Sequence, residues 1–331
     1  MTKNKSFKKQ IFKFNASEFE SFALQVFQWQ ATQNPIYRKY LNLLGTNPEK
    51  IKSILEIPFI PISFYKQHRV ISFTAEQIGG YYESSGTSQT IQSRHYYYDS
   101  SFYLRNTIEI FNRFYGDLTN FHILALLPGY LERKNSSLIA MVDQFIQKSA
   151  SHLSGFYLDD YDRLLETLDY AIKDAERKTL LLGVSFALLD LAEKKPPSFP
   201  DLVVIETGGM KGRREEMIRE ELHARLKDAF KVKEIHSEYG MTELFSQAYS
   251  QGGGLFDTPP WMKILLREHN DPFNLNFKTK SGAINVIDLA NIDSCAFIAT
   301  DDLAKLYDDG SFEVLGRLDH SDLRGCNLLM V

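Results

Sequence analysis

Between Phe121 and Phe230 the sequence alternates short apolar runs with longer amphipathic runs, and no other feature constrains the fold as strongly. Strands that alternate with helices in this way are typical of right-handed crossovers, which place the strands parallel in one sheet. The sequence therefore predicts an α/β fold with a mostly parallel sheet flanked by helices. The expected strands are Ile123–Leu127, Phe156–Leu158, Thr179–Val184 and Leu202–Ile205, and the expected helices are Leu138–Gln147, Tyr161–Glu176, 185–193 and Arg214–Phe230.

The chain changes character on either side of this central region. Apolar residues at three- and four-residue spacing predict a helix over Ser17–Gln30, and prolines three residues apart force extended backbone across Ile57–Phe64. After Leu255 short β-rich runs follow, with Asp308-Asp309-Gly310 as a hairpin turn. We therefore expect a helical N-terminal cap and linker over residues 1–60, an α/β core over 61–254 and a small antiparallel β subdomain over 255–331.

Composition and charge argue against several classes of protein. With 38 Lys+Arg against 42 Asp+Glu the formal net charge is -4, which gives no general attraction to nucleic acid. The scarcity of cysteine, with 2 residues and no Cys-x-x-Cys pair, argues against a disulfide-built secreted domain. The longest nearly apolar stretch, Leu180–Leu189, is about half of the ~20 residues that cross a bilayer. We expect no nucleic-acid partner, no membrane span and a cytoplasmic location.

Common catalytic and nucleotide-binding fingerprints are absent from the sequence. There is no Gly-x-x-x-x-Gly-Lys-Ser/Thr loop, no Gly-x-Gly-x-x-Gly after a strand, no Gly-x-Ser-x-Gly elbow and no His-Glu-x-x-His pair. P-loop, Rossmann, hydrolase and zincin functions therefore lose support. Any chemistry must come from the polar segments that remain.

The first of these polar segments reads Ser84-Ser85-Gly86-Thr87-Ser88 and precedes the aromatic run His95–Tyr98. Hydroxyl side chains around a glycine bring many hydrogen-bond donors and a closely approaching backbone to phosphate oxygens. The segment is therefore a candidate phosphate cradle. An ordinary surface hairpin has the same composition and is the alternative.

The second polar segment, Lys233–Glu243, is an extended run that meets a turn at Gly240 and is expected to open a helix. Thr242 and Glu243 would lie at the C-terminal end of a strand, where a hydroxyl and a carboxylate can bind a phosphate and its Mg2+. The alternative is a helix start in which Thr242 is the N-cap and Glu243 favours the helix dipole.

Three further segments add to this picture. Gly208 and Gly209 follow the expected strand Leu202–Ile205, so they should lie at the same sheet edge as Thr242. Thr300–Asp302 ends another expected strand, and Gly316–Asp319 follows the hairpin. A carboxylate there could accept both hydroxyls of a ribose and an arginine could pair with a phosphate, although a charged turn is the alternative. Loops that share one edge predict a pocket.

The order and spacing of four segments resemble the nucleotide motifs of adenylate-forming enzymes, the superfamily of acyl-CoA ligases that includes phenylacetate-CoA ligase. Those segments are Ser84–Thr87, Tyr239–Glu243, Thr300–Asp302 and Gly316–Asp319. Leu127–Leu138 and the ending Gly316–Leu328 further resemble the acyl-protein synthetase (LuxE-type) family, which supplies fatty acyl groups to the reductase of bacterial bioluminescence. The resemblance covers about residues 55–331.

This resemblance implies a fold, a reaction and a set of residues. The fold is expected to be the N-terminal domain of adenylate-forming enzymes, and the reaction is attack of a carboxylate, expected to be a fatty acid, on ATP. Thr242 would contact the α-phosphate and Glu243 would bind Mg2+, which makes both catalytic candidates. The implied nucleotide-binding residues are Ser84, Ser85, Gly86 and Thr87 at the phosphates, Gly208, Gly209 and Tyr239 around the adenine, and Asp302 and Arg317 at the ribose. Ser88 and Gly240 are implied as nucleotide-binding residues of the same segments.

The sequence departs from the superfamily in two places. Only 12 residues follow Asp319, whereas the usual adenylate-forming enzyme continues with a lid domain that bears a catalytic lysine. No lysine follows the Ser84–Thr87 loop either, and Arg94 and His95 are the nearest cations. Because a short chain is typical of acyl-protein synthetases, the missing lid favours that family over an ordinary CoA ligase.

Cys326 stands near the C-terminus, two residues after Arg324, which would favour its thiolate form. The resembled family is thought to carry its acyl group as a thioester on such a cysteine, so Cys326 is a further catalytic candidate. The acyl group would then pass to a partner such as an acyl reductase or transferase. Two alternatives are a ligase that uses CoA or a carrier protein directly, and a non-catalytic subunit of this fold that docks an acyl-processing enzyme. The other cysteine, Cys295, is expected in the core.

Overall fold

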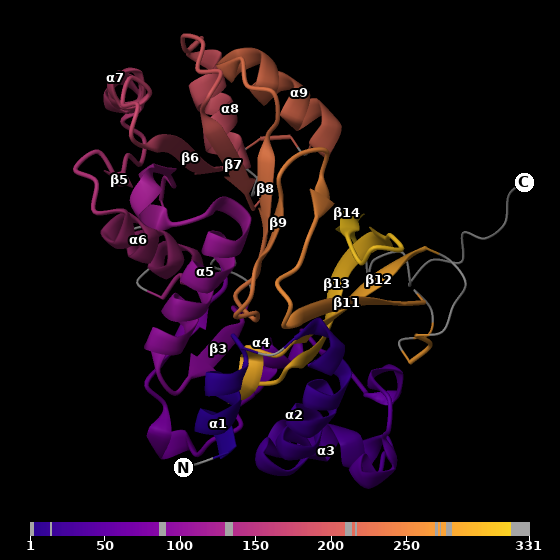
Figure 1. Cartoon of the computed structure of the whole chain (residues 1–331). Coiled ribbons are helices and arrows are strands. Elements are labelled where there is room, and N and C mark those ends of the chain that lie inside the picture. The colour runs from indigo at the N-terminus through magenta and orange to yellow at the C-terminus, as the bar shows by residue number, and fades with distance from the viewer. Residues whose placement is uncertain are drawn as a thin grey trace, which may run out of the picture.

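Two six-stranded sheets form the framework of the part of the chain that the structure describes (Figure 1). The computed structural model describes residues 3–13, 15–85, 91–129, 135–208, 214–215, 217–268, 271, 273–275 and 280–318. A separate antiparallel hairpin consists of β2 (Gly80–Glu83) and β3 (Arg94–Tyr97), so the Ser84 loop connects its two strands.

The first sheet is parallel apart from one edge strand. Its strand order is β5-β4-β6-β7-β8-β9, and β9 runs antiparallel to β8. The alternation of strands and helices in the sequence is thus confirmed, and with it the α/β class and the mostly parallel sheet. The strands are β4 (Phe121–Leu126), β5 (Gly155–Phe156), β6 (Lys178–Val184), β7 (Val203–Thr207), β8 (His236–Tyr239) and β9 (Ala248–Ser250), and the helices are α5 (Ser100–Tyr115), α6 (Ser137–Ser149), α7 (Tyr161–Ala171), α8 (Ser185–Glu193) and α9 (Arg219–Phe230).

Two predicted helix boundaries in this region are wrong, and a polar side-chain contact explains each. Helix α7 ends at Ala171 rather than Glu176, because the chain turns so that Asp174 pairs with His122 on β4 at 3.0 Å. Helix α9 begins at Arg219 rather than Arg214, because the Arg214 guanidinium instead pairs with Asp190 and Glu193 of α8.

The helix expected after Gly240 does not form, and residues 240–247 instead make turns that lead into β9. The reason is Asp288, the last residue of β12 (Ser281–Asp288). Its buried carboxylate accepts hydrogen bonds from the N–H groups of Phe245 (2.8 Å) and Ser246 (2.9 Å). Because each backbone N–H must be paired once it is buried, the carboxylate substitutes for the pairing that a helix would provide.

The second sheet is antiparallel in its C-terminal strands, as the sequence predicts. Its order is β10-β14-β13-β12-β11, and the short β1 pairs parallel with β13. Among the short β-rich runs expected after Leu255, the structure forms the 10-residue strand β13, whose pairing with β14 is irregular between Leu303 and Ala304. The strands not yet given are β1 (Ile60–Pro61), β10 (Leu255–Phe256), β11 (Met262–Arg267), β13 (Phe297–Leu306) and β14 (Phe312–Arg317).

The N-terminal helices pack beside the second sheet (Figure 1). The buried Gln30 side chain accepts a hydrogen bond from the Ala296 N–H (2.9 Å) and donates one to the Asn291 carbonyl oxygen (2.9 Å). The Phe27 ring meets Phe297 edge-on at 5.9 Å. These helices are α1 (Lys3–Gln10), α2 (Phe19–Gln33), α3 (Pro35–Leu43) and the short α4 (Phe64–Gln67). The two ends of the described chain therefore share a core, while the domain boundaries stay predictions.

Short 3-10 helices complete the described secondary structure: Ala16–Glu18, Pro48–Lys50, Ile54–Glu56, Ala75–Gln77, Leu118–Asn120 and Asn291–Asp293. Among the described residues, no helix has the length and apolar character needed to cross a bilayer.

Candidate active site

A cavity of about 1060 Å³ is lined by the ends of β7 and β8 from the first sheet and by β13 and β14 from the second. Every predicted site residue that the structure describes lines this cavity: Ser84, Ser85, Gly208, Tyr239, Gly240, Thr242, Glu243, Asp302 and Arg317. The other predicted site residues, Gly86, Thr87, Ser88, Gly209 and Cys326, lie outside the described residues. The fold thus gathers segments more than 200 positions apart around one space.

Tyr239, Asp302 and Arg317 form a hydrogen-bonded group that joins the two sheets. The Tyr239 hydroxyl donates to Asp302 Oδ2 (2.9 Å), and Arg317 Nε donates to Asp302 Oδ1 (3.2 Å). Asp302 and Arg317 are direct partners in the pairing of β13 with β14. Burial raises the pKa of Tyr239 and the Asp302 charge raises it further, so the phenol stays protonated. Asp302 is a carboxylate on the cavity wall whose lone pairs can accept further hydroxyl donors.

The loop that carries Thr242 and Glu243 is held from three sides. Asp288 binds the two backbone N–H groups described above. The Asn291 side chain donates to the Glu243 carbonyl oxygen (2.8 Å), and His95 Nδ1 donates to the Thr242 carbonyl oxygen (2.8 Å). These contacts come from β12, from the 3-10 helix that follows it, and from the hairpin strand β3. The loop is therefore fixed before any ligand binds, as transition-state stabilisation requires.

Glu243 is a buried carboxylate on the cavity wall. Burial raises its pKa, while a hydrogen bond from Ser93 and the charges of Arg317 and Lys66 act in the opposite direction. Burial disfavours the ionised carboxylate, so a nearby cation would stabilise it. Mg2+ is commonly bound by one or two carboxylates together with phosphate oxygens. Within the described ranges no group of three or more His, Cys, Asp or Glu side chains could hold a metal ion. The Glu243 carboxylate could serve as one ligand of a Mg2+ ion whose other ligands come from outside these side chains.

The two cations closest in sequence to the Ser84 loop do not supply positive charge to the cavity. Arg94 forms an ion pair with Glu83 across the hairpin (2.8 Å) and is absent from the cavity wall. His95 is fully buried, and burial lowers its pKa to about 4, so it is neutral at pH 7. Lys66, on α4, does line the cavity and lies close enough to Glu243 to affect its pKa.

The depressed pKa of His95 predicts a loss of stability in weak acid. Between about pH 6.5 and 4 the unfolded state binds a proton at this histidine that the folded state excludes, so stability falls by up to roughly 3 kcal/mol as the pH drops. His95→Gln should flatten this slope in urea unfolding measured at pH 7 and pH 4.5, because glutamine does not titrate. The same change at the exposed His68 should leave the slope intact, and an unchanged slope in His95→Gln would contradict the prediction.

Two glycines on the cavity wall occupy positions where a larger residue would be disfavoured. Gly208 leaves β7 with φ of 75°, which L side chains rarely adopt. At Gly240 an added Cβ would lie 2.2 Å from Glu238 Oε1. Glu238 is itself held there, because its Oε2 accepts a hydrogen bond from the Thr207 hydroxyl (2.5 Å).

Glu206 of β7 is a further buried carboxylate on the cavity wall that the sequence analysis does not name as a site residue. Its Oε2 accepts from the Ser185 hydroxyl (2.9 Å), and its Oε1 lies 3.7 Å from His223 Nε2. Burial opposes ionisation of Glu206, but the neighbouring His223, Ser237 and Ser185 side chains outweigh it and lower the pKa. The signal in the sequence is a charged residue directly after the apolar run 202–205.

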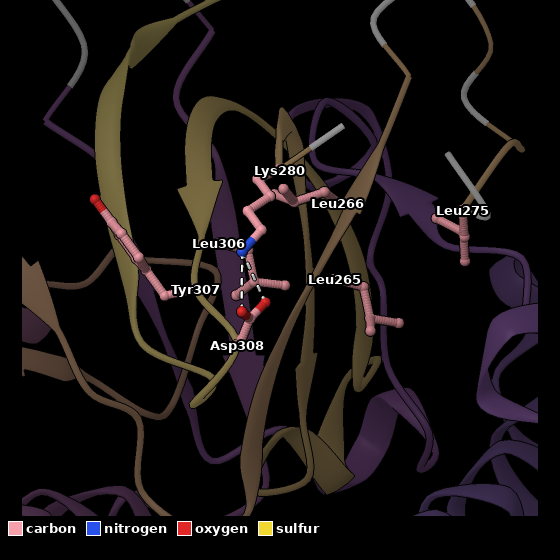
Figure 2. Close-up of a pocket in the computed structure, with 7 residues that line it drawn as sticks. All are labelled: Leu265, Leu266, Leu275, Lys280, Leu306, Tyr307 and Asp308. Atoms are coloured by element: carbon pink, nitrogen blue, oxygen red, sulfur yellow. Dashed lines mark hydrogen bonds and ion pairs between the residues drawn. The ribbon is translucent and has the colours of Figure 1, made fainter. Parts of the chain in front are cut away.

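A second cavity, of about 220 Å³, lies between β11 and the end of β13 (Figure 2). Leucine side chains line it, and Lys280 reaches the carboxylate of Asp308 at 2.9 Å, as the dashed lines in Figure 2 show. This ion pair satisfies both charges, and none of the predicted site residues lines the space. The larger cavity is therefore the candidate active site.

Comparison with solved structures identifies the class of fold. ATP-bound MatB from Rhodopseudomonas palustris is 16% identical to this chain with a TM-score of 0.53, and the match covers 75% of this chain and 49% of MatB. The ATP-bound RpMatB-BxBclM chimera B1 is 15% identical with a TM-score of 0.55, at 75% and 49% coverage. The fold is that of the adenylate-forming ligases, and the chain spans about half the length of these solved structures.

A sequence comparison is more specific. The long-chain-fatty-acid–luciferin-component ligase of Aliivibrio fischeri is 24% identical over 332 aligned positions, which cover 92% of this chain and 86% of that ligase. This similarity along nearly the whole chain confirms the resemblance to the acyl-protein synthetase (LuxE-type) family. No family model matches the chain.

Proposed function

We propose that this chain is an acyl-protein synthetase-type ligase. It uses ATP to convert a carboxylic acid, expected to be a fatty acid, to an acyl adenylate and then transfers the acyl group to a thiol. The observation that carries the proposal is the meeting of Tyr239, Thr242, Glu243 and Asp302 on one cavity wall. Its similarity to the fatty-acid ligase of Aliivibrio fischeri supports the choice of acid. The reaction is assigned to the cytoplasm, where ATP is available.

The nucleotide is expected to bind across the two sheets. Asp302 accepts the ribose hydroxyls, with Arg317 beside it, and Tyr239 borders the adenine together with Gly208 and Gly209. Ser84, Ser85, Gly86, Thr87 and Ser88 surround the phosphates. Asp302 supports this assignment because its carboxylate is fixed by Tyr239 and Arg317 and therefore loses little conformational freedom when a ribose binds.

The chemical step is a displacement at the α-phosphate. A carboxylate oxygen of the acid forms a bond to phosphorus while the bond to the pyrophosphate oxygen breaks, and pyrophosphate leaves with the electron pair. The Thr242 hydroxyl donates to an α-phosphate oxygen, and Lys66 is placed to neutralise charge on the leaving group. When bound through Glu243, Mg2+ supplies further positive charge to the phosphate oxygens.

The second half of the reaction transfers the acyl group. A thiolate sulfur, expected to be that of Cys326, attacks the acyl carbon, the bond to the AMP oxygen breaks, and AMP leaves. The thioester then passes its acyl group to a partner such as an acyl reductase or transferase.

Exchange of labelled pyrophosphate into ATP tests the adenylation half. The reaction is reversible, so exchange should depend on the presence of an acid that the cavity accepts. A panel of short, medium and long straight-chain acids, together with aryl acids, both tests the activity and identifies the acid class. Absence of exchange with every acid, even with a candidate partner protein added, would contradict the proposal.

Asp302→Asn should weaken ATP binding by about ten- to a hundredfold, because hydrogen bonds to a charged acceptor contribute about 1.5–3 kcal/mol. The diagnostic measurement compares KM for ATP with KM for 2′,3′-dideoxy-ATP. The wild type should discriminate strongly between them and Asp302→Asn should not. Asp308→Asn, at the second cavity, is the matched control. Undiminished discrimination in Asp302→Asn would remove the ribose assignment.

Lys66→Met should lower the exchange rate by about ten- to a hundredfold, because it removes a positive charge beside the leaving pyrophosphate. The same substitution at the exposed Lys52, whose ammonium donates to the Glu49 carbonyl oxygen, should have no effect. Equal rates for the two variants would show that Lys66 does not serve the phosphates.

A further inference from the structure

The cavity reaches both faces of strand β8, and the two faces carry different side chains. Successive residues of a strand point to opposite faces. Tyr239 points to the face where it meets Asp302, so Glu238 points to the other face. There Glu238 receives a hydrogen bond from Thr207, its partner in the pairing of β7 with β8. Because the proposed nucleotide site uses the Tyr239 face, the Glu238 face remains for the acid.

Helices α5 and α6 border the Glu238 face. Tyr103 of α5 lines the cavity, and its hydroxyl donates to the Ser137 carbonyl oxygen at the start of α6 (3.1 Å). Tyr115 of the same helix packs against His236, which lies two residues before Glu238 and therefore on the same face of β8. Leu138 and Met141 of α6 line the same cavity. These side chains provide an apolar wall for the tail of an acid.

Gln247 interrupts this apolar wall with an unpaired acceptor. The side chain lines the cavity with only 4% of its surface exposed, and its Oε1 has no hydrogen-bond partner in the part of the chain that the structure describes. Its Cγ would lie 3.4 Å from a Cβ at Gly240, where Glu238 Oε1 would also approach closely. The amide and the carboxylate therefore flank the same glycine. A buried acceptor without a donor is costly, so a ligand donor at this point is favoured.

We infer that the acid carries a hydrogen-bond-donating group on its tail, a hydroxyl or an amine, which donates to Gln247 Oε1. This inference rests on the proposed adenylation, because it assigns the Glu238 face to the acid. The amide oxygen of Gln247 can only accept a hydrogen bond, so the ligand must supply the donor. An unsubstituted hydrocarbon tail would leave Gln247 Oε1 unpaired.

The test compares each straight-chain acid with its monohydroxy and monoamino counterparts of the same length. Pyrophosphate exchange gives kcat/KM for each member, and calorimetry with the matching acyl-sulfamoyl adenosine analogues gives affinity without turnover. At the correct position the donor should improve both quantities by at least about tenfold, because a site built around a hydrogen bond discriminates against a ligand that lacks it. Comparison of the hydroxy acids with the amino acids shows which of the two donor groups the site prefers.

Gln247→Met removes the acceptor while keeping the length of the side chain, so it should abolish the preference for the substituted acid. Gln251→Met is the matched control, because Gln251 is exposed and bonds the Phe114 carbonyl oxygen away from the cavity. Exchange that favours plain acids, or a preference unchanged in Gln247→Met, would overturn the inference but leave the adenylation intact. If Gln247→Met instead raised the KM for ATP and affected all acids equally, Gln247 would belong to the nucleotide site. That result would also overturn the inference. No exchange and no analogue binding would instead count against the adenylation itself.

Discussion

Glu243→Gln is expected to reduce acid-dependent ATP–pyrophosphate exchange by at least about a hundredfold, because the amide cannot supply the negative charge that binds Mg2+. The carboxylate lies in a loop whose backbone is fixed by Asp288, Asn291 and His95, so its position on the cavity wall is defined. The measurement is the exchange rate at saturating ATP across a range of Mg2+ concentrations. High Mg2+ should not restore the rate.

Glu234→Gln is the control for this prediction, because Glu234 is an exposed glutamate that pairs with Lys227 on the surface. It should exchange at the wild-type rate. Wild-type exchange in Glu243→Gln would remove Glu243 from the reaction and, with it, the proposed metal position.

Glu243→Gln should be more stable than the wild type when both proteins are free of ligand at neutral pH. Burial raises the pKa of Glu243, so the folded state disfavours the ionised form and ionisation lowers the free energy of unfolding. This loss begins as the pH rises through the ordinary glutamate value of 4.5 and is complete above the raised value in the folded protein. Thermal unfolding should therefore show a gain for Glu243→Gln at pH 7 that disappears in acid. A lower melting temperature at pH 7 would contradict this account of the carboxylate.

Cys326→Ser is expected to abolish the covalent acyl-protein while leaving pyrophosphate exchange at its wild-type rate. Exchange needs only the adenylate, whereas the thioester needs a sulfur nucleophile. The measurement follows a radiolabelled acid into protein that has been denatured and precipitated, with hydroxylamine release as evidence for a thioester.

Cys295→Ala is the control, because Cys295 is the other cysteine of the chain and is fully buried. Burial raises the pKa of this thiol to about 12, so it contributes almost no thiolate at pH 7. If the radiolabel stayed on Cys326→Ser but was lost from Cys295→Ala, the acyl group would be assigned to Cys295 instead of Cys326. Product formation without any labelled protein would favour direct transfer to CoA or a carrier.

The main architecture follows from the sequence because it depends on local periodicity. The parallel sheet and the C-terminal antiparallel sheet both come from runs whose pattern is visible within a few residues. The helix expected at Thr242 is wrong because its backbone donors find Asp288, more than 40 positions later in the chain. Local propensity cannot include a partner that only the tertiary fold supplies.

The candidate site, like the fold, could be predicted from the sequence only in part. The segments at Ser84, Tyr239 and Asp302 could be recognised from their order, and the structure brings them to one cavity. Lys66, Gln247 and the placement of Glu238 could not, because a single lysine, glutamine or glutamate in a sequence carries no sign of the cavity that it lines. Residue type alone predicts His95 as a cation, whereas burial keeps it neutral.

Transfer of oxygen from the acid to AMP tests the central claim most directly. With an acid whose carboxylate carries ¹⁸O, adenylation followed by thiol attack on the acyl carbon leaves one labelled oxygen on AMP. The account predicts one AMP that carries a single ¹⁸O for each acyl group transferred, detected by mass spectrometry. Glu243→Gln should form almost no labelled AMP. Unlabelled AMP, or formation of ADP in place of AMP, would contradict it.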